Sequence, residues 1–211
     1  MKAFKNLILF FCILFCTTST FAYTLKEGNV TAIVGPFFYK TNFGDTDTGA
    51  KSPILGDVAL IIEGDINDHS ALEIGLFHMH KLYLRQQDGN SLVEQTQLFD
   101  ITLGYRYFFN PYVSLAVAFY SAFPLADVQV VHNDFPAGTD FDTSARDTSE
   151  NGFDFSLQTE LWHKENLAVV ADARYALSTT NKSDEKGDHY GLFIGVKFMV
   201  QEKERHNEKK E

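Results

Sequence analysis

The segment Gln97-Leu-Phe-Asp-Ile-Thr-Leu-Gly-Tyr-Arg-Tyr-Phe-Phe109 decides the fold of this chain. From Phe99 onward a large apolar side chain occupies every second position, and the residues between them as far as Tyr107 are Asp100, Thr102, Gly104 and Arg106. Successive side chains of a β-strand point to opposite faces, whereas a helix would scatter both sets around its axis. The pattern therefore predicts a strand with one apolar face and one polar face.

Seven further segments can be proposed as strands, six of them with the same alternation, so the sequence predicts eight strands. The other seven are Asn29–Lys40, Gly56–Ile66, Ser70–Arg85, Val113–Phe123, Gly152–Trp162, Leu167–Ser178 and His189–Val200. Both faces of the first are fairly apolar, so the sequence does not orient it.

The connections between these strands alternate in length. Three are tight, at 67–69, 110–112 and 163–166, and four are longer, at about 41–55, 86–96, 124–151 and 179–188. Short turns at one end and long loops at the other are typical of outer-membrane β-barrels.

The N-terminal segment has the layout of a secretion signal. A basic start is followed by the apolar run Asn6–Cys16 and by Thr20-Phe21-Ala22, which fits a small-residue cleavage site. The run is too short to cross a bilayer as a helix. The predicted organisation is a signal peptide at 1–22, a barrel domain at 23–200 and a charged, disordered periplasmic tail at 201–211.

Composition excludes several functional classes. The chain has 211 residues, 45% of them apolar and 22% charged, which favours one folded domain over disorder. The net charge is −10, or −12 once Lys2 and Lys5 leave with the signal, and a net acidic chain argues against nucleic-acid binding. Cys12 and Cys16 leave with the signal too, so the mature chain has no disulfide and no cysteine metal site.

The polar face of the predicted strands decides between a soluble barrel and a membrane barrel, which have opposite polarity. It carries charges of both signs among small residues, which suits the narrow interior of an eight-stranded barrel. We expect these charges to form a paired interior network: Glu63, Asp65, Glu73, Asp100, Arg106, Asp154, Glu160, Asp172, Arg174 and Lys197.

Aromatic residues gather near the ends of the predicted strands, as in the two girdles of a membrane barrel. The girdle candidates are Phe37, Tyr39, Tyr105, Tyr107, Phe109, Phe119, Phe123, Phe153, Phe155, Tyr190 and Phe198. The predicted fold is an all-β, eight-stranded, antiparallel up-and-down transmembrane β-barrel in the cell outer membrane.

From about residue 29 to 200, the pattern resembles the small eight-stranded outer-membrane barrels of the OmpA, OmpX and OmpW kind. The last strand, Gly191-Leu-Phe-Ile-Gly-Val-Lys-Phe198, is similar to the C-terminal insertion signal of such proteins. This chain departs from them in continuing for 13 residues past Phe198. No functional motif of that group can be carried over residue by residue.

Three groups of residues have side chains suited to metal binding or catalysis. His78 and His80 share a strand face, but with no clear third ligand we predict no metal there and an interfacial or lumenal structural role. In phase with Leu72 and Ile74 they would face lipid, unless a bulge near Phe77 returns them inside.

The acidic loop 124–151 offers possible cation contacts at Asp134, Asp140, Asp142 and Asp147, though without EF-hand spacing.

The third group is Ser178, Asp188 and His189, which could meet at the outer rim as a nucleophile and base. No nucleophile-elbow, phosphate-loop or zinc-protease motif accompanies them, so the sequence favours a protein that is not an enzyme. We also expect no pore, because eight strands leave no wide channel.

The predicted function is therefore a structural or surface-interaction role for an outer-membrane barrel with acidic extracellular loops. Its partners would be membrane lipid, lipopolysaccharide and an unidentified surface partner, and no cofactor is expected; the protein should be a monomer. The alternatives are a soluble periplasmic barrel carrying a small apolar ligand and a lipid-modifying outer-membrane enzyme with His189 as base.

Overall fold

The structure is a computed structural model, and it describes residues 25–47, 49–147 and 149–202. The predictions for the signal peptide at 1–22 and for residues 203–211 of the tail lie outside the described residues. No helix in the described part of the chain has the length and apolarity needed to cross a membrane.

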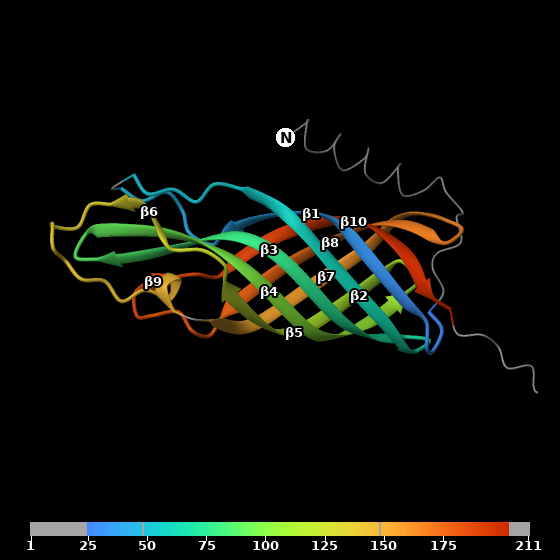
Figure 1. Cartoon of the computed structure of the whole chain (residues 1–211). Helices are drawn as coiled ribbons and strands as arrows, with labels where there is room; N and C mark the ends of the chain where they lie inside the picture. Colours follow the sequence, from blue (N-terminus) through green and yellow to red (C-terminus); the bar gives the residue numbers. More distant parts are fainter. Residues whose placement is uncertain (1–24, 48, 148, 203–211) are drawn as a thin grey trace, which may run out of the picture.

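Eight long strands form a closed antiparallel barrel, which confirms the predicted fold (Figure 1). Each barrel strand pairs with its neighbours in the chain, and β1 pairs with β10 to close the wall. The strands are β1 (Val30–Thr41), β2 (Leu55–Asn67), β3 (Ser70–Gln87), β4 (Asn90–Asn110), β5 (Val113–Pro124), β7 (Glu150–Lys164), β8 (Leu167–Ser178) and β10 (His189–Gln201).

The two ends of the barrel differ, and we call them the turn end and the loop end. Three tight turns and both ends of the described chain lie at the turn end, while the long connections lie at the other (Figure 1).

The prediction of a long loop at 86–96 is wrong, because these residues extend β3 and β4 into a hairpin that projects beyond the barrel. β4 pairs with β5 only from Leu98 onward, so the part of the hairpin above that level stands outside the wall. Its tip is Asp88-Gly89, with φ of 51° and 82°, the left-handed pair that a tight hairpin turn requires. The stretch after the tip lacks apolar alternation, so sequence periodicity did not mark it as a strand.

Short elements of the other loops pack on this hairpin. Within the long loop after β5, β6 (Gln129–Asn133) pairs with β4, and a 3-10 turn covers Ser144–Arg146. In the loop after β8, β9 (Glu185–Lys186) pairs with β3. The loop end is thus a folded extension of the barrel.

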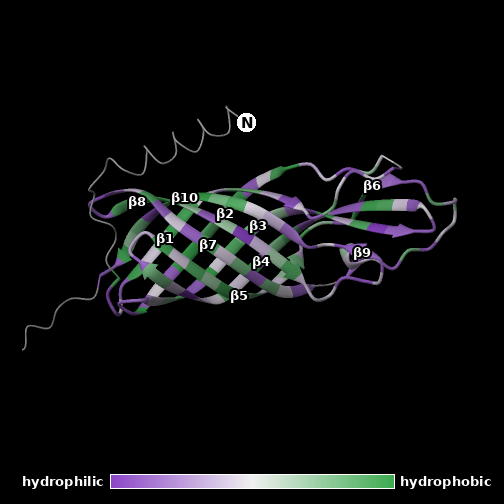
Figure 2. Cartoon of the chain, turned by 180° about the vertical axis from the view of Figure 1, so that it is seen from behind, coloured by the Kyte–Doolittle hydropathy of each residue, from purple (hydrophilic) through white to green (hydrophobic). Residues whose placement is uncertain are grey.

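The barrel has an apolar outer face and a charged interior. Figure 2 shows hydrophobic and hydrophilic residues alternating along the strands. Leu103, Val117 and Leu157 are exposed on the outside, whereas Glu73 and Arg106 are fully buried. This is the polarity of a membrane barrel and the reverse of that of a soluble ligand carrier.

The structure orients the first strand and corrects part of the predicted girdles. Phe37 and Tyr39 were assigned to the lipid-facing rings, but both point inward and are 2% exposed, while Val34 and Phe38 face outward. Phe37 packs inside against the ring of Phe77. Apolar rings fill this level of the lumen, so the interior is not polar throughout.

Candidate functional site

Arg106 lies at the centre of the lumen, where inward-facing charges from several strands meet. Its Nε donates to Glu73 Oε2 at 2.6 Å and its Nη2 to Asp172 Oδ2 at 3.0 Å. Hydroxyls of Ser114 and Ser156 accept its remaining hydrogen bonds, each at 2.9 Å. Because the guanidinium is fully buried, this set of acceptors is what compensates its lost hydration.

Arg174 extends the same network toward the loop end. Its Nε donates to Asp154 Oδ1 at 3.1 Å, and Nη2 and Nη1 reach Glu73 and Asp172 at 3.0 and 3.2 Å. The guanidinium also stacks 4.8 Å from the centre of the Phe77 ring. Two arginines thus share two carboxylates, and the cluster closes the middle of the barrel.

Lys197 and Glu63 form the layer below, toward the turn end. Lys197 Nζ donates to Glu63 Oε2 at 2.5 Å, and Gln158 Nε2 donates to the other oxygen at 3.2 Å. Glu63 Oε1 lies 3.3 Å from Arg106 Nε, which links the two layers.

The other three residues expected in the network lie apart from this cluster. Asp65 accepts a hydrogen bond from the backbone of Lys26 near the turn end, and Glu160 lies 3.6 Å from His163 Nδ1 beside a bulge in β7. Asp100 is buried nearer the loop end, and no ion pair joins it to a basic side chain among the described residues.

A second buried cluster, which the sequence did not reveal, closes the mouth of the lumen. Lys81, Tyr83 and Tyr120 all donate hydrogen bonds to the buried carboxylate of Glu150. Burial, reinforced by the Glu150 charge, raises the pKa of Tyr83 well above its usual range, so the phenol remains a donor. The sequence alone places Glu150 in the acidic loop 124–151, because nothing local shows that β7 begins there.

Above the mouth, buried acids hold the loops together. Glu94 accepts from the guanidinium of Arg146 at 2.7 Å and from the hydroxyl of Thr143. Glu185 accepts from the backbone N–H of Ser144 at 3.0 Å. The loops that follow β5 and β8 are therefore fastened to each other and to the β3–β4 hairpin.

Three of the four predicted loop cation contacts have partners within the chain. Lys182 Nζ lies 3.4 Å from Asp142 and 3.3 Å from Asp147, and Asp134 accepts from the backbone N–H of Ser91. Asp140 is exposed. Two of the four proposed carboxylates thus surround an ammonium group of the protein itself.

The candidate catalytic residues are not arranged for nucleophilic attack. Ser178 Oγ lies 3.4 Å from Thr180 Oγ1, while its backbone N–H donates to Asp188 Oδ1 at 2.9 Å. His189 points into the lumen, between the rings of Tyr39 and Tyr120. Among the described residues, no hydrogen bond joins the Ser178 hydroxyl to the His189 ring, so the base is not in place.

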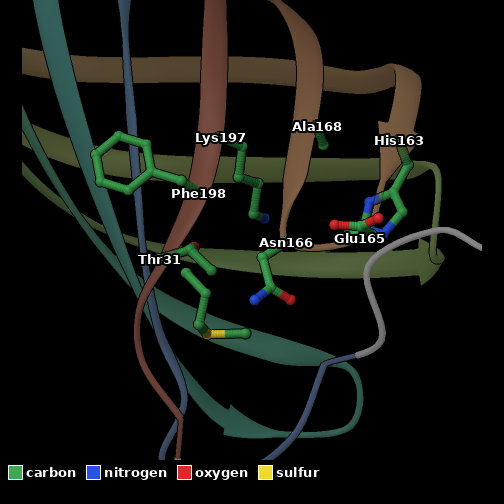
Figure 3. A pocket seen from close by; sticks show the side chains of 8 residues that line it. Thr31, His163, Glu165, Asn166, Ala168, Lys197 and Phe198 are labelled. Atoms are coloured by element: carbon green, nitrogen blue, oxygen red, sulfur yellow. The ribbon is translucent and has the colours of Figure 1, made fainter.

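Two cavities lie at opposite ends of the barrel. Figure 3 shows Thr31, Asn166 and Lys197 around a space of about 30 Å³ at the turn end, enough for about one water molecule. At the loop end, a shallow, largely polar cleft of about 430 Å³ lies between Asn42 to Gly44 and Asn181 to Asp188. Neither cavity passes through the charge cluster.

His78 and His80 keep the outward phase of Leu72 and Ile74, and the pairing of β3 with β4 runs without a register shift. The suggested bulge near Phe77 is therefore wrong. Both rings instead contact the carboxylate of Asp57, a residue that the sequence reading did not single out. No local sequence pattern predicts this contact, because Asp57 on β2 and His78 on β3 are 21 positions apart in the sequence.

Comparison with known proteins identifies the fold alone. No protein-family model matches the chain, and no curated protein matches its sequence. Among solved structures, the outer membrane protein OprG from Pseudomonas aeruginosa is 12% identical, covers 85% of this chain and 99% of its own, and has a TM-score of 0.53.

Two other outer-membrane barrels give lower scores. Ail, the attachment invasion locus protein of Yersinia pestis, is 13% identical with a TM-score of 0.46, covering 82% of this chain and 99% of its own. The outer membrane protein AlkL is 13% identical with a TM-score of 0.41, covering 89% and 97%.

Proposed function

We propose, from the premise that this chain has the fold of the small eight-stranded outer-membrane barrels, that it is an outer-membrane protein with a surface-interaction role. The barrel would serve as a closed anchor, and the folded extension at the loop end would meet partners outside the cell. Lipid would contact the apolar outer face.

The distribution of ordered structure carries this proposal. In the part of the chain that the structure describes, paired charges and rings occupy the lumen, which favours a role outside the barrel over transport through it. The loop end, by contrast, has two additional short strands and a 3-10 turn fastened by buried acids. A protein that served only to span the membrane would not need ordered loops of this extent.

Charge indicates the kind of partner. The segments 41–55, 81–97, 124–150 and 178–189 at the loop end hold 13 acidic and 6 basic side chains. Asp45, Asp47, Asp127 and Asp140 are exposed there. Such a surface would attract a cationic partner, and it would meet anionic lipopolysaccharide only through intervening cations.

The test measures binding of the folded protein, in lipid nanodiscs, to a polylysine-coated surface at low ionic strength. We expect binding that weakens several-fold when Asp45, Asp47, Asp127 and Asp140 are changed to Asn, because the loop end then loses four charges. A matched variant, Asp68→Asn with Glu165→Gln, removes charge from the turn end and should bind as before. Equal binding by all three proteins would contradict the proposed role of the acidic loops.

A further inference from the structure

Strands β2 and β3 separate before either of them ends. Their pairing begins at Asn67 and Ser70 and stops at Ala59 and Phe77. β2 nevertheless continues along β1 as far as Leu55, and β3 continues along β4 to the hairpin tip. The wall of the barrel is therefore split toward the loop end, and side chains rather than backbone hydrogen bonds must bridge the split.

Three side chains with metal-binding atoms meet at this split. His78 Nδ1 lies 2.9 Å from Asp57 Oδ1, and His80 Nδ1 lies 3.2 Å from Oδ1 and 3.1 Å from Oδ2. The ligand atoms that the three residues offer all lie within 4.8 Å of one another. The two imidazole rings face each other edge to face, with centroids 5.2 Å apart.

The separation of the strands is what makes this contact possible. His78 and His80 face outward on β3, whereas Asp57 has the inward phase of Ala59 and Ile61 on β2. In a continuous sheet these side chains would lie on opposite faces. Where β2 and β3 no longer pair, the Asp57 carboxylate can reach through the opening to both rings.

Neighbouring groups hold the three ligands in position. The Tyr39 hydroxyl donates to Asp57 Oδ2 at 2.5 Å, and the backbone N–H of His80 donates to the same oxygen at 3.2 Å. The side-chain amide of Gln97 lies against Nε2 of His78, which leaves Nδ1 directed at Asp57. Orienting contacts of this kind are typical of the groups that surround the ligands of protein metal sites.

The donor set and its spacing fit a divalent transition-metal ion. Imidazole nitrogens bind zinc at about 2.0–2.1 Å and carboxylate oxygens at about 2.0–2.2 Å, so tetrahedral ligands lie roughly 3.4 Å from one another. The observed separations of 2.9–3.2 Å between the imidazole nitrogens and the Asp57 oxygens are within a few tenths of an ångström of that spacing. The side chains of His78, His80 and Asp57 are 31%, 44% and 11% exposed, so an ion can enter from outside.

We propose that Asp57, His78 and His80 form a binding site for a divalent transition-metal ion of the Zn²⁺ class. The bound ion joins β2 to β3 where their backbone pairing ends. Three protein ligands leave a coordination position for water, and the site is independent of the acidic loops invoked above.

The experiment titrates ZnCl₂ into the full-length mature protein, folded in detergent micelles without a histidine tag and treated beforehand with a chelator. We expect saturable binding of about one ion per chain, and a higher temperature for the heat-induced shift in gel mobility because the ion links two strands. Co²⁺ in place of Zn²⁺ should give the visible absorption bands of a low-symmetry site with nitrogen and oxygen ligands.

Three variants make the test specific. Asp57→Asn and His80→Gln each remove a ligand and should weaken Zn²⁺ binding by more than the roughly 10–100-fold that loss of an outer contact costs. His132→Gln is the matched control, since His132 lies 3.5 Å from Asp134 in a histidine–carboxylate pair that lacks a second histidine. The heat-shifted band shows that each variant is folded.

Two results would overturn the proposal. One is the absence of saturable Zn²⁺ binding by the folded wild-type protein. The other is equal affinity in Asp57→Asn, His80→Gln and His132→Gln, which would place the ion elsewhere. Loss of binding in the first two variants with retention in the third would support it, whatever the polylysine measurement gives.

Discussion

Arg106 illustrates how a single residue can hold a narrow lumen together. It contacts three carboxylates and two hydroxyls from five other strands, β2, β3, β8, β5 and β7. Removing one partner of a buried ion pair destabilises a protein more than replacing the whole pair with apolar side chains, because the remaining charges stay buried without compensation.

We therefore expect Arg106→Ala to lower the free energy of unfolding by about 3–5 kcal/mol. Urea unfolding of the protein in detergent, followed by tryptophan fluorescence and gel mobility, measures the change. Arg106→Lys retains the charge but loses the planar fork, so its loss should be smaller. An unchanged midpoint for the alanine variant would disprove the inward role of Arg106.

At the scale of the element, the β3–β4 hairpin is the largest departure from the expected strand lengths. It stands beyond the wall of the barrel and depends on its own turn and on β6 and β9 for support. Asp88 and Gly89 both have positive φ, and only glycine adopts that conformation at little steric cost.

Gly89→Val should therefore loosen the hairpin tip while leaving the barrel folded, at a local cost of about 1–2 kcal/mol. Limited proteolysis should show faster cleavage near residues 85–95, with the heat-shifted band retained. Gly64→Ala is the matched control, because an added Cβ at Gly64 has no heavy atom within 4 Å. Equal protection of the two variants would show that the turn conformation does not govern the hairpin.

At the scale of the whole molecule, three successive clusters of buried side chains close the lumen along its length. Lys197 with Glu63 fills the turn end, the two arginines fill the middle, and Glu150 with its three donors fills the mouth. Side chains just fill the interior of an eight-stranded barrel, so no continuous water path is expected.

Folded protein reconstituted into planar lipid bilayers should accordingly give no discrete conductance steps. A water-filled porin in the same bilayers serves as the positive control, and a heat-shifted band confirms that the barrel is intact. Stable ohmic steps from the folded protein would mean that the charge clusters rearrange to open a path.

The sequence by itself determined the features that depend on local periodicity. Alternation from Phe99 to Phe109 and in the other segments predicted eight strands, and the mixed charges between the apolar residues predicted the polarity of the barrel. It could not orient β1, because both faces of that strand are apolar. It also missed the extended hairpin, because the stretch after the tip lacks apolar alternation, and the closure around Glu150, because nothing local shows that β7 begins there.

Only the tertiary structure decided which of these side chains meet. Contacts across a barrel depend on the register between strands and on the stagger that closes the wall, and neither is encoded in the period of one strand. Asp57 meets His78 and His80 because two strands part above Ala59 and Phe77. That separation is a property of the closed barrel and its loops, so no single segment of the sequence predicts it.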